Sequence, residues 1–407
     1  MKIEIFTMTQ SIIKEEIKNR NVICQKCILI DGPFGVSLNT EGFCNFCEDP
    51  TFETPTWKKT IIEDSLREEK REDWYTLVKY WQETYGADEY CCLLGFSGGK
   101  DSTALIDTFV NEYHLKPFLV TVNVGFMTDI AKNNIKQTLG KMNLTNDHIF
   151  IDASFQTFTK LYKYFLSEYK PQSDEKCVSL SICHTCTDLI HTTIVKEAMR
   201  RDLDHVVIGF SPDQIARYFY ETSPEDTLAD GIPHPQKHID NLDENDLKWY
   251  LNPDISLVEL PLVLYPYHVI DYNQSEIIQR IESKGLIEIG KGDPVLTNCH
   301  VVMTGMLYDL HRFGGVSYSF QYAELVRQQV EPERWKQERK AWLRTMKRVA
   351  KGLLNGQLAT EGINTVLNRI GISRQELLSD IEIQVEQDSN KNQIRKNIEL
   401  LRRGRFK

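Results

Sequence analysis

The sequence predicts an α/β fold, in which a doubly wound parallel sheet is preceded by a small cysteine-rich module and followed by an α-helical region. Three observations predict it. Two closely spaced cysteine pairs lie before residue 58, and apolar runs alternate with amphipathic stretches from about 60 to 315. Such alternation is typical of parallel strands joined by crossover helices. The remainder shows no strand pattern. We therefore divide the 407 residues into three predicted domains, 1–58, 59–315 and 316–407.

The elements of the middle domain follow from these runs. We expect strands at Tyr90–Phe96, Phe118–Asn123, His148–Ile151, His205–Phe210 and Ser256–Leu260. We expect helices at Ser102–Glu112, Ala131–Leu139, Phe158–Glu168, Thr187–Arg201 and Gln274–Lys284. The polar, proline-containing segment Ser223–Lys248 predicts a loop or lid over the carboxyl edge of the sheet. In the last domain we expect a strongly basic stretch at Glu331–Lys351 and a short helix pair at Gly362–Leu377.

Composition excludes several classes of protein. Hydrophobic residues make up 41% of the chain, which is enough for ordinary buried cores. The net charge of -10 argues against a protein that coats nucleic acid through its overall charge. The charged first twenty residues do not resemble a signal peptide, and no apolar run reaches the roughly 18 residues of a spanning helix. We expect a soluble cytoplasmic protein with no membrane attachment.

Four cysteines in the first domain have the spacing of a metal site. Cys24-x2-Cys27 and Cys44-x2-Cys47 are separated by sixteen residues, which matches four-thiolate zinc sites. In a reducing cytoplasm disulfides are not expected. Because four thiolates leave no open coordination position, we interpret the site as structural zinc on which folding of the module depends. A redox-active or cluster site is the alternative.

A glycine-rich turn is the most informative stretch of the middle domain. An apolar strand ends in Ser97-Gly98-Gly99-Lys100-Asp101-Ser102, and a helix pattern follows. The two glycines allow a tight turn whose N–H groups approach an anion, and the helix adds its positive N-terminal end. Lys100 adds a cation, and the two serines add hydroxyl donors. Together they suit pyrophosphate, and Asp101 among phosphates implies an intervening Mg²⁺.

Ser97–Ser102 after a strand resembles the signature of the N-type PP-loop ATP pyrophosphatases, and not the Walker loop. GMP synthetase, tRNA-thiolating enzymes and sugar amidotransferases belong to that superfamily. The resemblance covers about residues 85–310 and implies a PP-loop (HUP-like) fold that splits ATP into AMP and pyrophosphate. It implies catalytic roles for Lys100 and Asp101. It places ATP against Ser97, Gly98, Gly99, Lys100, Asp101, Ser102, Asn123 and Gly125.

The family's fourth strand usually ends in Gly-His-x-x-Asp-Asp, and here the matching stretch is Gly209–Gln214. Asp213 is retained, whereas Gln214 replaces the second carboxylate, which puts the metal geometry in doubt. The resemblance implies that Asp213 shares the magnesium with Asp101. The alternative is that Asp213 caps a helix after Pro212.

A second thiol set lies inside the middle domain. Cys183 and Cys186 flank His184-Thr185 before an expected helix, and Cys299 lies far downstream. Three thiolates on a [4Fe–4S] cluster leave one iron free for sulfide or substrate, and some PP-loop tRNA thiolases have this order of cysteines. The alternatives are a second zinc site completed by Cys177, Cys299 or His184, and plain buried thiols. Cys91 and Cys92 lie in an expected core strand, where packing explains them.

The last domain carries a basic, tryptophan-containing stretch. Its residues are Arg334, Trp335, Lys336, Arg339, Lys340, Trp342, Arg344, Lys347, Arg348 and Lys351, and the chain ends in Arg402–Lys407. Basic residues interleaved with aromatics can hold RNA. More commonly such a run is the solvated face of an amphipathic helix whose tryptophans pack inward, and we favour this interpretation.

These patterns leave two enzymatic hypotheses. In the first, the adenylated oxygen of a tRNA or small molecule is replaced by sulfur at Cys183, Cys186 and Cys299, with a sulfur-carrier partner. In the second, ammonia from a glutaminase partner forms an amide or amine on an N-acetyl sugar. The stretch around Cys24–Cys47 resembles the N-terminus of N-acetyl sugar amidotransferases. A tRNA-binding module without catalysis is a third hypothesis, against which the intact glycine loop argues. A homodimer is left open.

Overall fold

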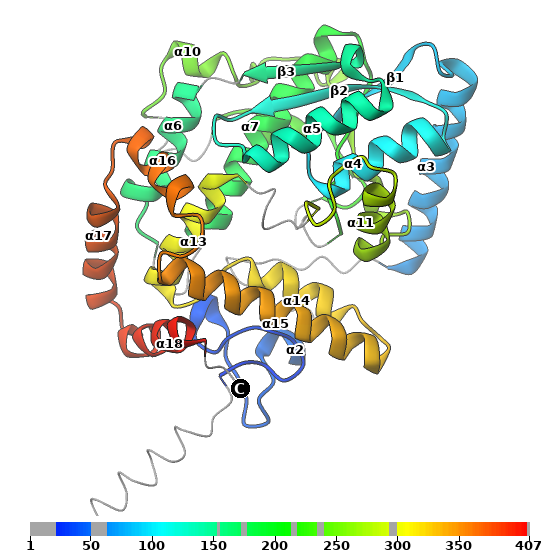
Figure 1. Ribbon diagram of the computed structural model, residues 1–407. Coiled ribbons are helices and arrows are strands. Elements are labelled where there is room, and N and C mark those ends of the chain that lie inside the picture. The colour runs from blue at the N-terminus through cyan, green and yellow to red at the C-terminus, as the bar shows by residue number, and fades with distance from the viewer. Residues whose placement is uncertain are drawn as a thin grey trace, which may run out of the picture.

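A six-stranded sheet forms the centre of the computed structural model, which describes residues 22–49, 63–152, 155–171, 177–212, 218–233, 240–292 and 299–404. The strand order is β3-β2-β1-β4-β6-β5, and every neighbouring pair is parallel except β5 with β6 (Figure 1). The strands are β1 (Tyr90–Gly95), β2 (Lys116–Asn123), β3 (His148–Asp152), β4 (His205–Val207), β5 (Glu221–Thr222) and β6 (Leu262–Leu264).

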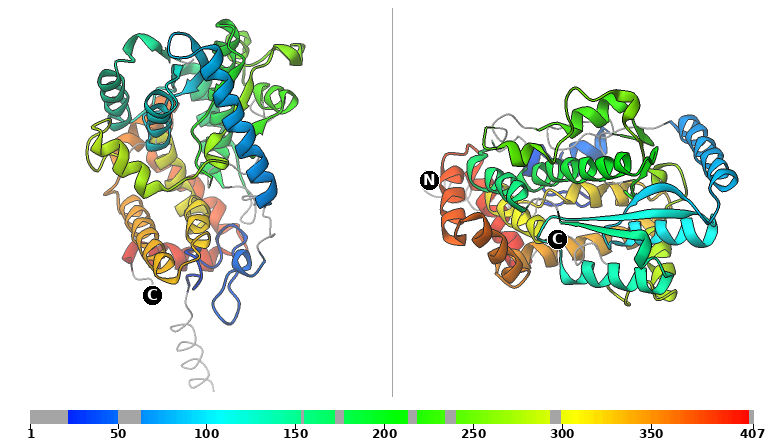
Figure 2. Two further views of the ribbon diagram at one scale, coloured as in Figure 1. Left: turned by 90° about the vertical axis from the view of Figure 1, so that its right-hand side faces the viewer. Right: turned by 90° about the horizontal axis from the view of Figure 1, so that it is seen from above.

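Both faces of the sheet are covered by helices, because successive strand side chains point to opposite faces. Leu93 belongs to one core cluster with α6 and α7, whereas the next residue, Leu94, belongs to another with α3, α4, α5 and α11. Figure 2 shows helices on either side of the strands. These helices are α3 (Asp64–Thr84), α4 (Lys100–Asp107), α5 (Asp129–Met142), α6 (Phe155–Lys163), α7 (Val178–Arg200) and α11 (Gln274–Ser283). The predicted mixed α/β fold with a mostly parallel sheet is therefore confirmed.

The order of the strands determines where a ligand can enter. From β1 the chain continues to β2 and β3 on one side, and it then returns to place β4 on the other side of β1. In open α/β sheets, such a reversal leaves a crevice beyond the carboxyl ends of the two central strands. The predicted glycine loop follows β1 directly, so the fold brings it to this crevice.

The described residues 316–404 are largely helical, as predicted. Their helices are α14 (Ser319–Arg327), α15 (Pro332–Leu354), α16 (Thr360–Ile370), α17 (Arg374–Glu386) and α18 (Lys391–Arg403). They pack with α13 (His300–Phe313), which contacts α7 of the sheet layer. The cysteine module lies below α14 and α15 in Figure 1, with the rings of Phe34 and Phe313 5.0 Å apart. The two ends of the chain thus share one core.

Two sequence-based expectations about the bounds of elements are wrong. Ser256–Leu260 is not a strand: Leu257–Glu259 forms one 3-10 turn with Val258 92% exposed, and the strand is β6. The helix expected from Thr187 begins at Val178, so Cys183 and Cys186 lie inside it. Its start is missed because Asp309, 131 residues later, accepts hydrogen bonds from the N–H groups that begin the helix.

The segment expected as a loop over the sheet edge contains helices α8 (Pro224–Gly231) and α10 (Glu244–Leu247). Ser223 and Asp243 cap them through their side chains, and α8 packs on α7. None of its described residues, 223–233 and 240–248, lines the cavity described below. Over the described residues, no helix has the length and apolarity needed to cross a membrane.

Candidate functional site

The glycine loop turns sharply between β1 and α4. Gly98 has φ +74°, and a Cβ there would lie 2.4 Å from the carbonyl oxygen of Ala131. Gly209, after β4, is less strictly constrained, since its Cβ would lie 3.2 Å from the backbone of Ser102. The hydroxyls of Ser97 and Ser102 are 3.2 Å apart and stabilise the turn. These glycines therefore allow the loop, α5 and the end of β4 to approach one another closely.

A lysine, a carboxylate and a tyrosine meet at the start of α4. The Nζ atom of Lys100 lies 2.6 Å from Oδ2 of Asp101 and 2.8 Å from the hydroxyl of Tyr272. That hydroxyl donates to Oδ1 of Asp101 at 2.9 Å. Lys100 and Asp101 are both buried. Buried charges require such pairing, so the sequence-predicted lysine and carboxylate are held together and fixed in orientation.

One cavity of about 350 Å³ joins the glycine loop to the second thiol set. Its lining includes Ser97 and the Gly99–Ser102 stretch on one side, and Cys183, Cys186 and Cys299 on another. The segment directly after β4 contributes Ile208–Ser211, as the strand order predicts. Because residues about 200 positions apart in sequence meet here, the candidate site is a property of the tertiary fold.

Each thiol of the Cys183/Cys186 pair has a tyrosine partner. The hydroxyl of Tyr318 donates to Sγ of Cys183 at 2.7 Å, and that of Tyr162 lies 3.2 Å from Sγ of Cys186. Burial raises the pKa of Cys183 to about 12 and also raises the pKa of Cys186 and Cys299. Thiols in this setting are neutral at pH 7 unless a cation or cluster stabilises their charged form.

The spacing of the three cavity thiols restricts what they can hold. Among the described residues, only the knuckle cysteines form a group whose ligand atoms all lie within 4.8 Å of one another. The three cavity thiols are therefore spread more widely than a single zinc ion requires, whereas a multi-iron cluster binds each thiolate to a different iron. The donor set fits a cluster better than one ion.

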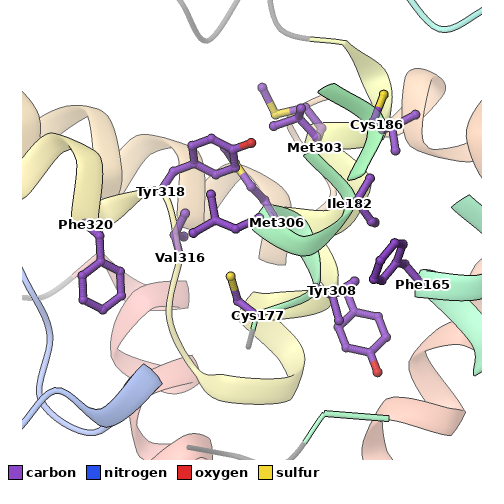
Figure 3. Packing of buried hydrophobic residues seen from close by; sticks show 14 of the residues in the cluster. Phe165, Cys177, Ile182, Cys186, Met303, Met306, Tyr308, Val316, Tyr318 and Phe320 are labelled. Atoms are coloured by element: carbon purple, nitrogen blue, oxygen red, sulfur yellow. The ribbon is translucent and has the colours of Figure 1, made fainter. Parts of the chain in front are cut away.

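Of the three residues suggested to complete a second zinc site, Cys299 lines the cavity, whereas Cys177 and His184 do not. His184 is exposed on α7, and Cys177 is buried at the start of that helix without lining the cavity. Figure 3 shows Cys177 and Cys186 at different levels of the core, with Tyr318 reaching in from the segment before α14. The second-zinc alternative therefore has no fourth ligand among these side chains. Cys91 and Cys92 are buried within β1, where they pack in the core.

The other residues placed by the resemblance have different positions. Asn123 ends β2, and its amide donates to Asp152 at 2.8 Å and accepts from the N–H of Gly125. Neither Asn123 nor Gly125 is among the described residues that line the cavity, although Val122 and Val124 are. Asp213 lies outside the described residues, so the structure does not place it.

The knuckle thiols form a compact group. The distances are 3.8 Å between Sγ of Cys24 and Cys47, and 3.6 Å between Sγ of Cys27 and Cys44. Four thiolates about 2.3 Å from a tetrahedral ion would be about 3.8 Å apart, so this set fits one zinc ion. These sulfur atoms are too close together for each to bind a different iron of a four-iron cluster. The N–H groups of Leu29 and Cys44 donate to sulfur and further support the charged thiolates.

The basic helix α15 connects the knuckle to the cavity. Arg339 donates to the carbonyl oxygens of Cys27 and Cys24, and the indole of Trp335 donates to that of Lys26. About two turns further along the same face, Trp342 stacks on Tyr322 with ring centroids 4.2 Å apart, and both line the cavity. The favoured interpretation, tryptophans packing inward on an amphipathic helix, fits Trp342, which is buried.

Sequence reasoning missed the tyrosines of this site. Tyr272 follows a 3-10 turn, Tyr162 lies in α6, and Tyr318 precedes α14. Aromatic residues in apolar runs look like core residues, and nothing local marks their hydroxyl groups as partners of a lysine or a thiol. Only Tyr272 has a feature visible in the sequence: it lies two residues before Gln274, where a helix is predicted to begin.

Comparisons with known proteins do not assign the chain to a family. No protein family and no curated protein matches the chain. Among solved structures, the chain is similar to the U34-tRNA thiolase NcsA from Methanococcus maripaludis with its [4Fe-4S] cluster. The two are 13% identical with a TM-score of 0.31, over 81% of this chain and 89% of that one. This similarity is too low to indicate what the chain does.

Proposed function

We propose that the chain is an ATP pyrophosphatase of the PP-loop class that adenylates an oxygen atom of its substrate and replaces it with sulfur. The observation that carries this proposal is the single cavity lined by both Ser97–Ser102 and the thiols of Cys183, Cys186 and Cys299. An activation site and a transfer site must lie this close because the adenylated intermediate is attacked before water reaches it.

The activation half uses the glycine loop. A substrate carbonyl or enol oxygen attacks the α-phosphorus of ATP, the bond to the β-phosphate breaks, and pyrophosphate leaves. The N–H groups at the start of α4 and the ammonium of Lys100 stabilise the departing charge. Asp101 would hold Mg²⁺. Its carboxylate has about four lone-pair positions, and the bonds from Lys100 and Tyr272 occupy two of them, so two remain for the metal.

The transfer half uses the three thiols. Hydrosulfide, or the terminal thiocarboxylate of a carrier protein, supplies the nucleophile; with the thiocarboxylate, water afterwards cleaves the bond between its carbonyl carbon and the transferred sulfur and leaves a carboxylate on the carrier. The sulfur of the nucleophile attacks the activated carbon, the carbon–oxygen bond breaks, and AMP leaves with the original oxygen. A cluster bound by three thiolates would supply an iron that can hold sulfur. The uncharged side chains nearby, including Ile190, Val302 and Leu325, limit water.

Two variants test the proposal. Lys100→Ala removes the cation at the loop, and we expect at least tenfold weaker ATP binding, since a charge-assisted bond contributes about 1.5–3 kcal/mol. Cys299→Ser should leave ATP binding unchanged and lower the iron content of anaerobically prepared protein. Calorimetric titration with MgATP and iron and sulfide analysis check these expectations. Unchanged ATP binding by Lys100→Ala, or iron-free wild-type protein, contradicts the proposal.

A second candidate is an N-acetyl sugar amidotransferase that uses ammonia from a glutaminase partner. The compact Cys24–Cys47 knuckle favours it, since the sequence there resembles those enzymes. Adding unfractionated tRNA with sulfide, or a nucleotide-linked N-acetyl sugar with ammonia, separates the two. AMP should form with the first pair under the sulfur hypothesis and with the second under the amide hypothesis.

A further inference from the structure

The hydroxyl of Tyr272 bridges the two charged residues of the glycine loop. It accepts from Nζ of Lys100 at 2.8 Å and donates to Oδ1 of Asp101 at 2.9 Å. Lys100 also contacts Oδ2 of the same carboxylate, so the three groups close a ring of hydrogen bonds. The bridge links the start of α4 to the segment before α11, which is about 170 residues away in sequence.

We propose that Tyr272 is a positioning residue, which orients the Asp101 carboxylate toward a divalent cation and the Lys100 ammonium toward a triphosphate. This inference rests on the proposed function, because it assumes that MgATP binds at the loop. The carboxylate torsion of aspartate is broad, and lysine has a long flexible stem. One hydroxyl that both donates and accepts restrains both side chains.

The surroundings hold the hydroxyl of Tyr272 in place. The ring of Tyr267 packs edge-on against that of Tyr272 at 5.3 Å, and its own hydroxyl donates to the backbone carbonyl of Asp101 at 3.1 Å. Arg280 of α11 donates to the carbonyl of Ala104 in α4. These contacts fix α11 against α4, so the position of the hydroxyl is set by packing outside the loop.

The same segment reaches the ligand cavity. Gln274, two residues after Tyr272, lines it beside Lys100 and Asp101. A tyrosine that only filled space would need its ring and no particular position for its oxygen. Here the oxygen lies within hydrogen-bond distance of both charged groups, and phenylalanine would keep the ring contacts while removing only that oxygen.

The test compares Tyr272→Phe with Tyr267→Phe, which also removes one hydroxyl bond to Asp101, but at its backbone. ATP binding is titrated by calorimetry at a series of Mg²⁺ concentrations, and thermal unfolding is measured in parallel. We expect Tyr272→Phe to raise the Mg²⁺ concentration for half-maximal binding by roughly 10- to 100-fold, as loss of an outer-shell partner does at metal sites. Its melting temperature should stay within about 3 °C of wild type.

Tyr267→Phe should leave the Mg²⁺ dependence of ATP binding within about threefold of wild type, because the side chains of Lys100 and Asp101 keep their bridge. If Tyr272→Phe shows the Mg²⁺ dependence of wild type while Lys100→Ala loses ATP binding, Tyr272 does not position the pair and the inference is overturned. If Lys100→Ala itself binds ATP normally, the proposed function fails first. An equal effect of both tyrosine variants also overturns the inference, since it indicates a general loosening of α4.

Discussion

The molecule contains two cysteine sets that begin with the same Cys-x2-Cys spacing but occupy different environments. In the knuckle, four sulfur atoms lie within 4.8 Å of one another. In the cavity, Cys183 and Cys186 occupy one face of α7, Cys299 precedes α13, and two of the three thiols have a tyrosine hydroxyl as neighbour. The four knuckle sulfur atoms are close enough to share one ion, whereas the three cavity thiols are spread over the wall of a cavity.

This difference shows that the same Cys-x2-Cys spacing in sequence can lead either to a compact set of four thiols or to a widely spaced set of three. A closed set of four thiolates leaves no coordination position for chemistry. A set of three on the wall of a cavity leaves one. The two cysteine sets differ in their contacts with residues distant in sequence. The knuckle packs against α14, whereas Tyr318, just before α14, contacts Cys183. One helix and the residue before it thus connect with both sets.

The largest expected effect comes from breaking the knuckle. Cys44→Ser removes one of four ligands, and we expect a loss on the order of 5 kcal/mol of folding free energy, because metal binding and folding of such modules are coupled. The aromatic contact of Phe46 with Phe320 should be lost with it. Cys299→Ser is the matched control, and its melting temperature should change little. Zinc analysis with thermal unfolding measures both, and equal stability of the two variants would contradict the structural assignment.

A smaller loss of folding free energy should follow from removing the carboxylate of Asp309, which joins α13 to the start of α7. Asp309 of α13 is fully buried and accepts from the N–H groups of Val178 and Ser179 and from the hydroxyl of Ser317. Asp309→Ala leaves these donors unpaired, at a cost of about 3 kcal/mol. Because this carboxylate begins the helix that carries Cys183, iron retention should fall as well. Urea unfolding checks the first effect, and Asp380→Ala, at the exposed surface, is the control.

Much of the sheet could be predicted because its signals are local. β1, the glycine loop and α5 depend on apolar runs, glycines and a threonine cap that lie next to one another in sequence. The start of α7 could not be predicted from local signals, since its capping carboxylate comes from α13. The same holds for the site: Lys100 and Asp101 could be identified from the loop, whereas Tyr272 and Tyr318 acquire their partners only through tertiary packing.

The tyrosine partner of a cavity thiol should have a moderate effect. Tyr318→Phe removes the hydroxyl that donates to Cys183 but keeps the ring in the core. We expect a bound cluster to lose iron to a chelator roughly tenfold faster, the lower end of the effect of outer-shell partners. Absorbance bleaching of anaerobically reconstituted protein measures the rate. Tyr308→Phe, whose hydroxyl bonds to Gln384 away from the thiols, is the control. Identical rates for both variants would assign Tyr318 to packing alone.

The smallest expected effect is a loss of folding stability at low pH that depends on the sheet and not on the knuckle. Burial lowers the pKa of His148 to about 4, and its ring nitrogen lies 2.9 Å from the hydroxyl of Thr121 in β2. Because the folded pKa lies below the unfolded value of about 6.5, this histidine contributes full stability above pH 6.5. That contribution is lost as the pH falls toward 4. His148→Gln should therefore weaken the pH dependence of urea unfolding between pH 6.5 and 5. Release of zinc loaded onto the knuckle should be unchanged, since that release would depend on protons competing for thiolates. If the variant instead alters zinc release and not the slope, acid acts through the knuckle, and the two regions are not independent.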